Sequence, residues 1–238
     1  MNRAPAFNLP SPVIWLATAL IAVHGVRQLL GEEAGSWVLL AFAFIPERYG
    51  ELAYSLPGGV TARFWSPLTY SLLHADILHL LVNLVWMASF GAALARRLGG
   101  IRFLLLGLIA AAAGAGLHFA MHADDVALMI GASGAVSGMM AATTRFAFAP
   151  GGPLAGGAPP ASYRVPAEPL ARVFTTSRAL GFILVWFAVN LLFGLADGMV
   201  PGASGPIAWE AHLGGFLAGL LLFPLFDPIQ AQRFPAAG

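Results

Sequence analysis

The sequence contains no cysteine and no lysine, and only 10% of its 238 residues are charged. Without cysteine the protein can form no disulfide bond, thiolate nucleophile or thiolate metal ligand. The small net charge of +1, with no basic stripe, predicts no nucleic-acid partner. Soluble domains usually carry about 25% charged residues, whereas 58% of this chain is hydrophobic and its mean hydropathy is +0.78. The composition therefore predicts a polytopic membrane protein surrounded by membrane lipids.

Apolar stretches long enough to cross a bilayer recur along the chain, since a span needs about 20 apolar residues. We expect an all-α, polytopic bundle of six transmembrane helices within residues 13–227, between terminal tails at 1–12 and 228–238. The expected spans are residues 13–30, 68–95, 101–121, 126–149, 179–200 and 211–226. No small-residue cleavage site follows the first span, so we expect it to be retained.

Two stretches within this region are not expected to span. Residues 150–178 are rich in proline, glycine and alanine, and we interpret them as an extramembrane linker between the fourth and fifth spans. Residues 36–46 are apolar but too short to cross the bilayer, which indicates an interfacial or re-entrant piece before the second span.

All basic residues are arginines, and they are distributed unevenly about the six expected spans. Three lie on one side, namely Arg27, Arg48 and Arg63. The other nine of the twelve lie on the side that holds both termini, namely Arg3, Arg96, Arg97, Arg102, Arg145, Arg164, Arg172, Arg178 and Arg233. The positive-inside rule then makes both termini cytoplasmic. The compact form predicts a bacterial inner membrane protein.

Polar groups recur at one depth in three of the expected spans. Ser133 lies near the outer end of the fourth span, His212 near that of the sixth, and His79 near that of the second. Polar side chains inside a membrane are costly and usually functional. Because a serine hydroxyl becomes a nucleophile beside a histidine base, these spans predict a catalytic site near the outer boundary.

Small residues flank both Ser133 and His212. Glycines four apart share one helix face, and such bare faces let neighbouring spans approach closely. The glycines that we expect to pack helices are Gly131, Gly134, Gly138, Gly215 and Gly219.

His79 and Asn83 are also four residues apart, so they share a face of the second span. Their N–H groups could hold an oxyanion. Ser133 would attack a carbonyl, and His212 would take its proton. No carboxylate is well placed within a span to orient His212, so the predicted machinery is a Ser-His dyad.

These motifs, in this order on these spans, resemble the rhomboid family of intramembrane serine proteases. The resemblance lies in His79 and Asn83 after His74, in Gly131-Ala132-Ser133-Gly134, and in Ala211-His212-Leu213-Gly214-Gly215 with Gly219. It implies that Ser133 is the nucleophile, that His212 is the general base, and that His79, Asn83 and the Ser133 N–H form an oxyanion hole. It also implies that residues 201–210 are a mobile cap over the site.

The implied substrate is a transmembrane protein that is cut near its outer membrane boundary. Three positions differ from residues that family members often have. Ser66 follows Trp65 where an arginine is common, and Ala95 precedes the arginine pair where a glutamate is common. Ser137 stands four residues after the expected nucleophile, where an aromatic ring often stacks on the catalytic histidine.

Other interpretations remain open at this point. Ser133 could be a helix-packing serine, and the protein could be an inactive rhomboid-like binder of transmembrane helices. A small transporter or channel would also place polar groups in spans, although these cluster near one face. The second Gly-Ala-Ser-Gly sequence, at Ser204, lies in a proline-flanked loop and is not expected to supply a nucleophile.

A metal site is also considered at His118 and His122, which share a helix face. Metal sites need more ligands and a supporting shell, so we predict no metal and no cofactor. The expected partners are transmembrane protein substrates and lipids.

Overall fold

A computed structural model describes residues 8–195 and 208–229, where the chain is helical and the only β-pairing is an isolated antiparallel bridge between Phe44 and Met129. The long helices are α1 Ser11–Leu29, α4 Ile77–Trp86 continuing through the π-helical turn η5 Met87–Gly91 into α5 Ala92–Leu98, α6 Gly100–Met121, α7 Ser133–Ala147, α9 Ser177–Leu195 and α10 Trp209–Phe226. The shorter ones are α2 Glu32–Phe42, α3 Ala62–Thr69, α8 Leu170–Thr175, η1 Pro46–Tyr49, η2 Glu51–Tyr54, η3 Gly59–Thr61, η4 Tyr70–Leu72 and η6 Ala161–Arg164. The all-α prediction is confirmed.

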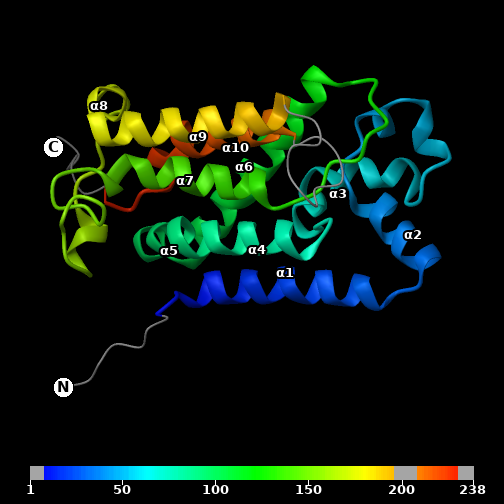
Figure 1. The fold of residues 1–238 in the computed structure, drawn as a ribbon, viewed down its shortest axis with the longest axis horizontal. Helices are drawn as coiled ribbons and strands as arrows, with labels where there is room; N and C mark the ends of the chain where they lie inside the picture. The colour runs from blue at the N-terminus through cyan, green and yellow to red at the C-terminus, as the bar shows by residue number, and fades with distance from the viewer. Residues whose placement is uncertain (1–7, 196–207, 230–238) are drawn as a thin grey trace, which may run out of the picture.

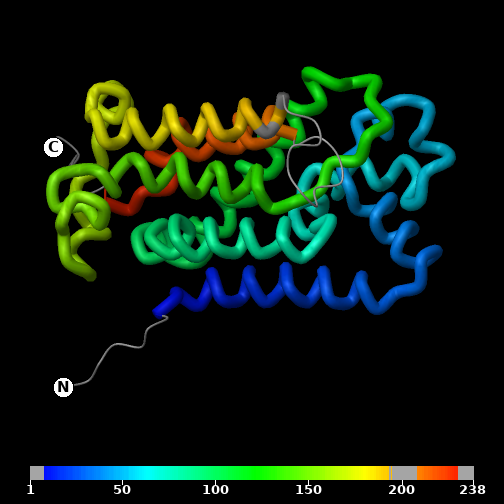
Figure 2. The backbone as a smooth tube through the Cα atoms, viewed as in Figure 1, coloured from blue at the N-terminus to red at the C-terminus, as the bar shows by residue number. Residues whose placement is uncertain are grey.

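Helix α7 runs through the middle of the bundle (Figure 1). In this view α4 and α5 lie on one side of it, α9 and α10 lie on the other, and α1 lies along the outside beyond α4 and α5. The tube in Figure 2 shows that α2 and α3 gather at one end, where α7 and α10 begin. The start of α1 and the end of α10 lie at the opposite end.

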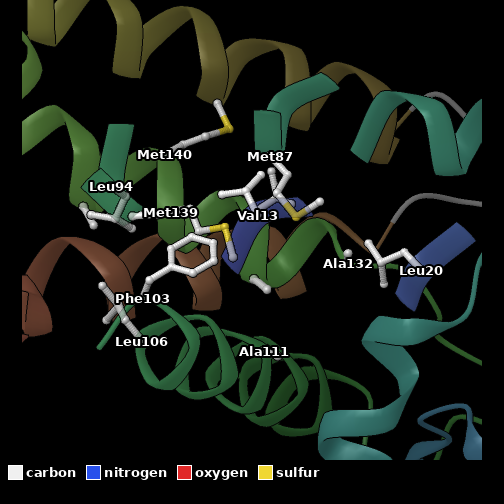
Figure 3. Close-up of a cluster of buried hydrophobic side chains, with 14 of the residues drawn as sticks. Val13, Leu20, Met87, Leu94, Phe103, Leu106, Ala111, Ala132, Met139 and Met140 are labelled. Carbon is white, nitrogen blue, oxygen red and sulfur yellow. The ribbon is translucent and has the colours of Figure 1, made fainter. Parts of the chain in front are cut away.

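The centre of the bundle contains side chains from several helices. Figure 3 shows Val13 of α1, Met87 of η5, Phe103 of α6 and Met139 of α7 gathered together. All four are 2% exposed or less. Methionine side chains are unbranched and adaptable, so they fill the irregular space between helices of different direction.

Helix α7 packs very closely against α10 because both carry small residues at the contact. Every residue of α7 after Ser133 is buried. A Cβ added at Gly215 would overlap the carbonyl oxygen of Gly134, and one at Gly219 would overlap that of Gly138. In lipid, where apolar burial does not drive helices together, such close packing is a main source of association.

Four helices of the described chain are long and apolar enough to cross a membrane: Ser11–Leu29, Ile77–Leu98, Gly100–Met121 and Trp209–Phe226. They agree with the first, second, third and sixth expected spans. Helix α9 is also apolar, and α7 has only 15 residues. The count of six spans stays a prediction.

Two expected spans begin later than predicted. The helix predicted from residue 68 begins at Ile77, because Asp76 accepts a hydrogen bond from the His79 N–H at 2.8 Å and caps a new helix there. The helix predicted from residue 126 begins at Ser133, after Gly131 adopts a φ of +122° that an α-helix cannot continue. At 1.5 Å per residue α7 is about 22 Å long, which is less than the roughly 30 Å hydrocarbon core. Its first residue can therefore lie below the membrane surface.

Residues 150–178 contain η6 and α8 and pack against the end of the bundle away from the start of α7. Arg97 donates to Asp227 at 3.0 and 2.8 Å and to the carbonyl oxygens of Tyr163 and Val165 at 3.0 and 2.8 Å. Both charged side chains of the ion pair are fully buried. This bidentate pair joins α5, the end of α10 and the expected linker.

Candidate active site

Ser133 and His212 are brought into hydrogen-bonding contact although 79 residues separate them in sequence. The Ser133 Oγ lies 2.7 Å from the His212 Nε2. Ser133 begins α7 and His212 lies in the first turn of α10, and these two helix starts lie at the same end of the bundle (Figure 1). Both residues are partly exposed. The pair has the distance that proton transfer from a serine hydroxyl to an imidazole requires.

The local backbone presents Ser133 at a helix start. Gly131 has a φ of +122°, and a Cβ there would lie 2.6 Å from the His79 Nε2, so this position needs glycine for two reasons. Gly131 is thus not the helix-packing glycine that was predicted, because it lies before α7. As the first residue of the helix, Ser133 has a backbone N–H without an intrahelical acceptor. That N–H and the positive end of the helix dipole favour a negative charge beside the Ser133 hydroxyl.

His79 and Asn83 lie on α4 next to this helix start. The contact between the His79 ring and the Gly131 position places the imidazole beside the Ser133 segment. Asn83 is 3% exposed, and its amide donates to the His79 carbonyl oxygen at 2.9 Å. An amide nitrogen carries two N–H groups, so one N–H of Asn83 is not used by this bond.

His74 lies beneath the same segment and is completely buried. Its ring centroid is 5.1 Å from that of His79, and its Nε2 is 3.4 Å from the Ala132 N–H that donates to it. Arg27 of α1 donates to the His74 carbonyl oxygen at 2.7 Å. These contacts hold His74, in the segment before α4, against Ala132, the residue that precedes Ser133.

Asn190 of α9 is a further residue of the site that was not predicted from the sequence. Its Oδ1 contacts the His212 Nδ1, and its Nδ2 donates to the Trp186 carbonyl oxygen at 2.8 Å. The second hydrogen bond directs the amide oxygen toward the histidine, so Nδ1 carries the proton. Nε2 is then left as an acceptor facing Ser133, which is the tautomer that a base needs. A polar residue within an apolar span was the available signal.

A pair of aromatic residues supports this part of α9. The rings of Trp186 and Phe216 are stacked, with centroids 4.3 Å apart and planes inclined by 22°. Ser137, which stands where the resemblance leads one to expect an aromatic ring, is buried in α7. His212 is thus oriented by a hydrogen bond from α9, and α9 is itself fastened to α10 by stacked rings.

Several predicted features fall partly or wholly outside the described residues, among them residues 1–7 of the N-terminal tail, residues 196–200 of the fifth expected span and residues 230–238 of the C-terminal tail. Ser204, the alternative serine, lies outside them, as do residues 201–207 of the expected cap.

Residues 61–227 match the family model described as the Rhomboid domain. The match begins just before α3 and ends just after α10, so it contains Ser133, His212, His79, Asn83 and Asn190.

Proposed function

The chain belongs to the rhomboid family, and from this premise we propose that it is an intramembrane serine endopeptidase with Ser133 as nucleophile and His212 as general base. The observation that carries the proposal is the 2.7 Å separation of the Ser133 Oγ and the His212 Nε2. The apolar helices and the family make it an integral membrane protein. Rhomboid proteins act on transmembrane substrates and lie in lipid.

In the first step, the Ser133 Oγ attacks the carbonyl carbon of the scissile peptide bond, and its proton passes to the His212 Nε2. The carbonyl oxygen becomes an oxyanion, which accepts hydrogen bonds from the Ser133 N–H, Asn83 and His79. Because Ser133 heads α7, the helix dipole adds to this stabilisation.

In the second step, the tetrahedral intermediate collapses and the C–N bond breaks. His212 returns the proton to the departing amine, and an acyl ester on Ser133 remains. A water molecule then attacks the ester carbonyl and gives a proton to the His212 Nε2. The bond between the acyl carbon and the Ser133 Oγ breaks, His212 returns the proton to that oxygen, and the carboxylate product leaves. Asn190 holds the imidazole throughout and stabilises its protonated form. The proposed machinery is therefore the predicted Ser-His dyad together with an uncharged third residue, Asn190.

The substrate is proposed to be a transmembrane protein that is cut near its outer membrane boundary. From the distribution of arginines we propose that the start of α1 and the end of α10 lie on the cytoplasmic side of a bacterial inner membrane. Ser133, at the start of α7, then lies toward the outer leaflet. Because α7 is shorter than the hydrocarbon core, this residue can lie below the outer membrane surface.

Cleavage of a transmembrane reporter by wild-type protein and by Ser133→Ala tests the proposal. The variant should express normally and cleave nothing, and a serine-directed fluorophosphonate should label only the wild type. Undiminished cleavage by Ser133→Ala would refute the assignment. The alternative of an inactive helix binder is prompted by Ser137 and predicts reporter binding without cleavage or labelling in either protein.

A further inference from the structure

A second cluster of polar side chains lies where the end of α6 meets the start of α10. It consists of His118, His122 and Glu210, which can each supply one ligand atom such that all three atoms lie within 4.8 Å of one another. The two histidines are four residues apart and share a face, and their ring centroids are 4.9 Å apart. Glu210, in the first turn of α10, adds the third potential ligand, which the spacing of the histidines alone could not reveal.

The carboxylate of Glu210 is buried, and among the described residues it forms no ion pair with an arginine. Glu210 is 4% exposed, and in the part of the chain that the structure describes the basic side-chain nitrogens within 4.0 Å of its carboxylate all belong to histidines. His122 Nε2 contacts Oε1 directly, and His118 Nδ1 lies 3.9 Å from the same oxygen. A buried carboxylate needs compensation by positive charge and hydrogen bonds.

A simple ion pair between His122 and Glu210 leaves two polar atoms unexplained. The Oε2 of Glu210 and the Nδ1 of His118 are both buried, and neither has a hydrogen-bond partner among the residues that the structure describes. Buried polar atoms are almost always satisfied. A cation held between the two rings and the carboxylate would use the lone pair of His118 and neutralise Glu210 at once.

We propose that His118, His122 and Glu210 bind a divalent transition-metal ion of the zinc class. Two imidazoles and one carboxylate are a common three-ligand zinc set, with water as the fourth ligand. Tetrahedral zinc with bonds of about 2.0–2.2 Å separates neighbouring ligand atoms by roughly 3.3 Å, which is near the 3.9 Å between His118 and Glu210. The direct contact between His122 and Glu210 is shorter than this separation, so the partly exposed His122 ring must move outward to admit the ion. Calcium and magnesium prefer oxygen ligands and fit this set poorly. The His122 side chain is 37% exposed, which provides an entry path.

The site would stabilise the helix that carries the proposed base. Glu210 precedes His212 by two residues, so at 100° per residue the two side chains leave α10 on nearly opposite sides. The metal would therefore not touch Ser133. It would fasten the first turn of α10 to α6 and so fix the position of His212 relative to α6.

Cobalt titration of metal-free, full-length protein in detergent tests the proposal. One equivalent of Co²⁺ should bind with the intense visible absorbance of four- or five-coordinate cobalt, Zn²⁺ should displace it, and Zn²⁺ should raise the thermal midpoint. Glu210→Gln and His118→Gln should each weaken binding at least about tenfold. Asp124→Asn, an exposed neighbour, and His24→Gln, a buried histidine outside the cluster, should bind like the wild type.

Circular dichroism of each variant without metal shows whether it has folded, and His122→Gln replaces any variant that has not. Failure of the wild type to bind cobalt, a weak octahedral spectrum, or equal affinity in the wild type and in the folded cluster variants would overturn the proposal. The cluster would then be an ion pair between two helices.

Discussion

Replacement of Asn190 by leucine removes the acceptor for the His212 Nδ1 while keeping a side chain of similar size in α9. In the wild type this acceptor fixes the tautomer of His212 and leaves Nε2 facing the Ser133 Oγ at 2.7 Å. In Asn190→Leu the imidazole can rotate or carry its proton on the wrong nitrogen, and the imidazolium formed during attack has lost its partner.

The expected loss of activity in Asn190→Leu can be estimated from the hydrogen bond between Asn190 and the positively charged ring of His212. Such a bond contributes about 1.5–3 kcal/mol, which corresponds to a loss of roughly 10- to 150-fold in kcat. Because Asn190 acts through His212, the loss should appear in kcat and leave KM nearly unchanged. Asn190→Asp keeps an acceptor and should recover most of the activity.

The assay is cleavage of a transmembrane reporter in liposomes, together with the rate of labelling by a fluorophosphonate. Ser89→Ala is the matched control, because the hydroxyl of this exposed residue also bonds a backbone carbonyl four residues earlier, that of Val85, at 2.8 Å. It should leave both rates unchanged. Wild-type kcat and labelling in a folded Asn190→Leu protein would refute the positioning role, as would a change confined to KM.

The remaining predictions concern the oxyanion hole and the helix contact. Asn83→Ala should lower kcat by about 10²- to 10³-fold through the loss of one oxyanion donor, as measured by reporter cleavage; a loss of less than threefold would remove Asn83 from that role. Gly215→Val should lower the thermal midpoint sharply, because even a Cβ at this position would overlap the Gly134 carbonyl oxygen. Gly181→Val on α9, where a Cβ would meet nothing within 4 Å, is the control, and equal midpoints for the two variants would contradict the packing argument.

The family and the helical class could be predicted from the sequence because they depend on features that are local in the chain. Apolar runs identify segments that belong in lipid, and the motifs at Ser133 and His212 in their order predicted the rhomboid family, which the family match confirms. The start of α7 was placed wrongly, because hydropathy does not register the positive φ of Gly131 that ends the preceding segment.

The tertiary structure decided which side chains meet across the bundle. Asn190 and Glu210 belong to none of the sequence motifs that were predicted to form the site. Their hydrogen-bond partners depend on how α9 and α10 are rotated about their axes. That rotation is set by contacts such as the close approach of Gly215 to Gly134, between helices far apart in the sequence. Sequence alone thus determined the helical class, the rhomboid family and the four apolar helices that are long enough to cross a membrane. Only packing decided that His212 has an amide partner and that Glu210 faces two histidines, because the direction of a side chain is a property of the assembled helices.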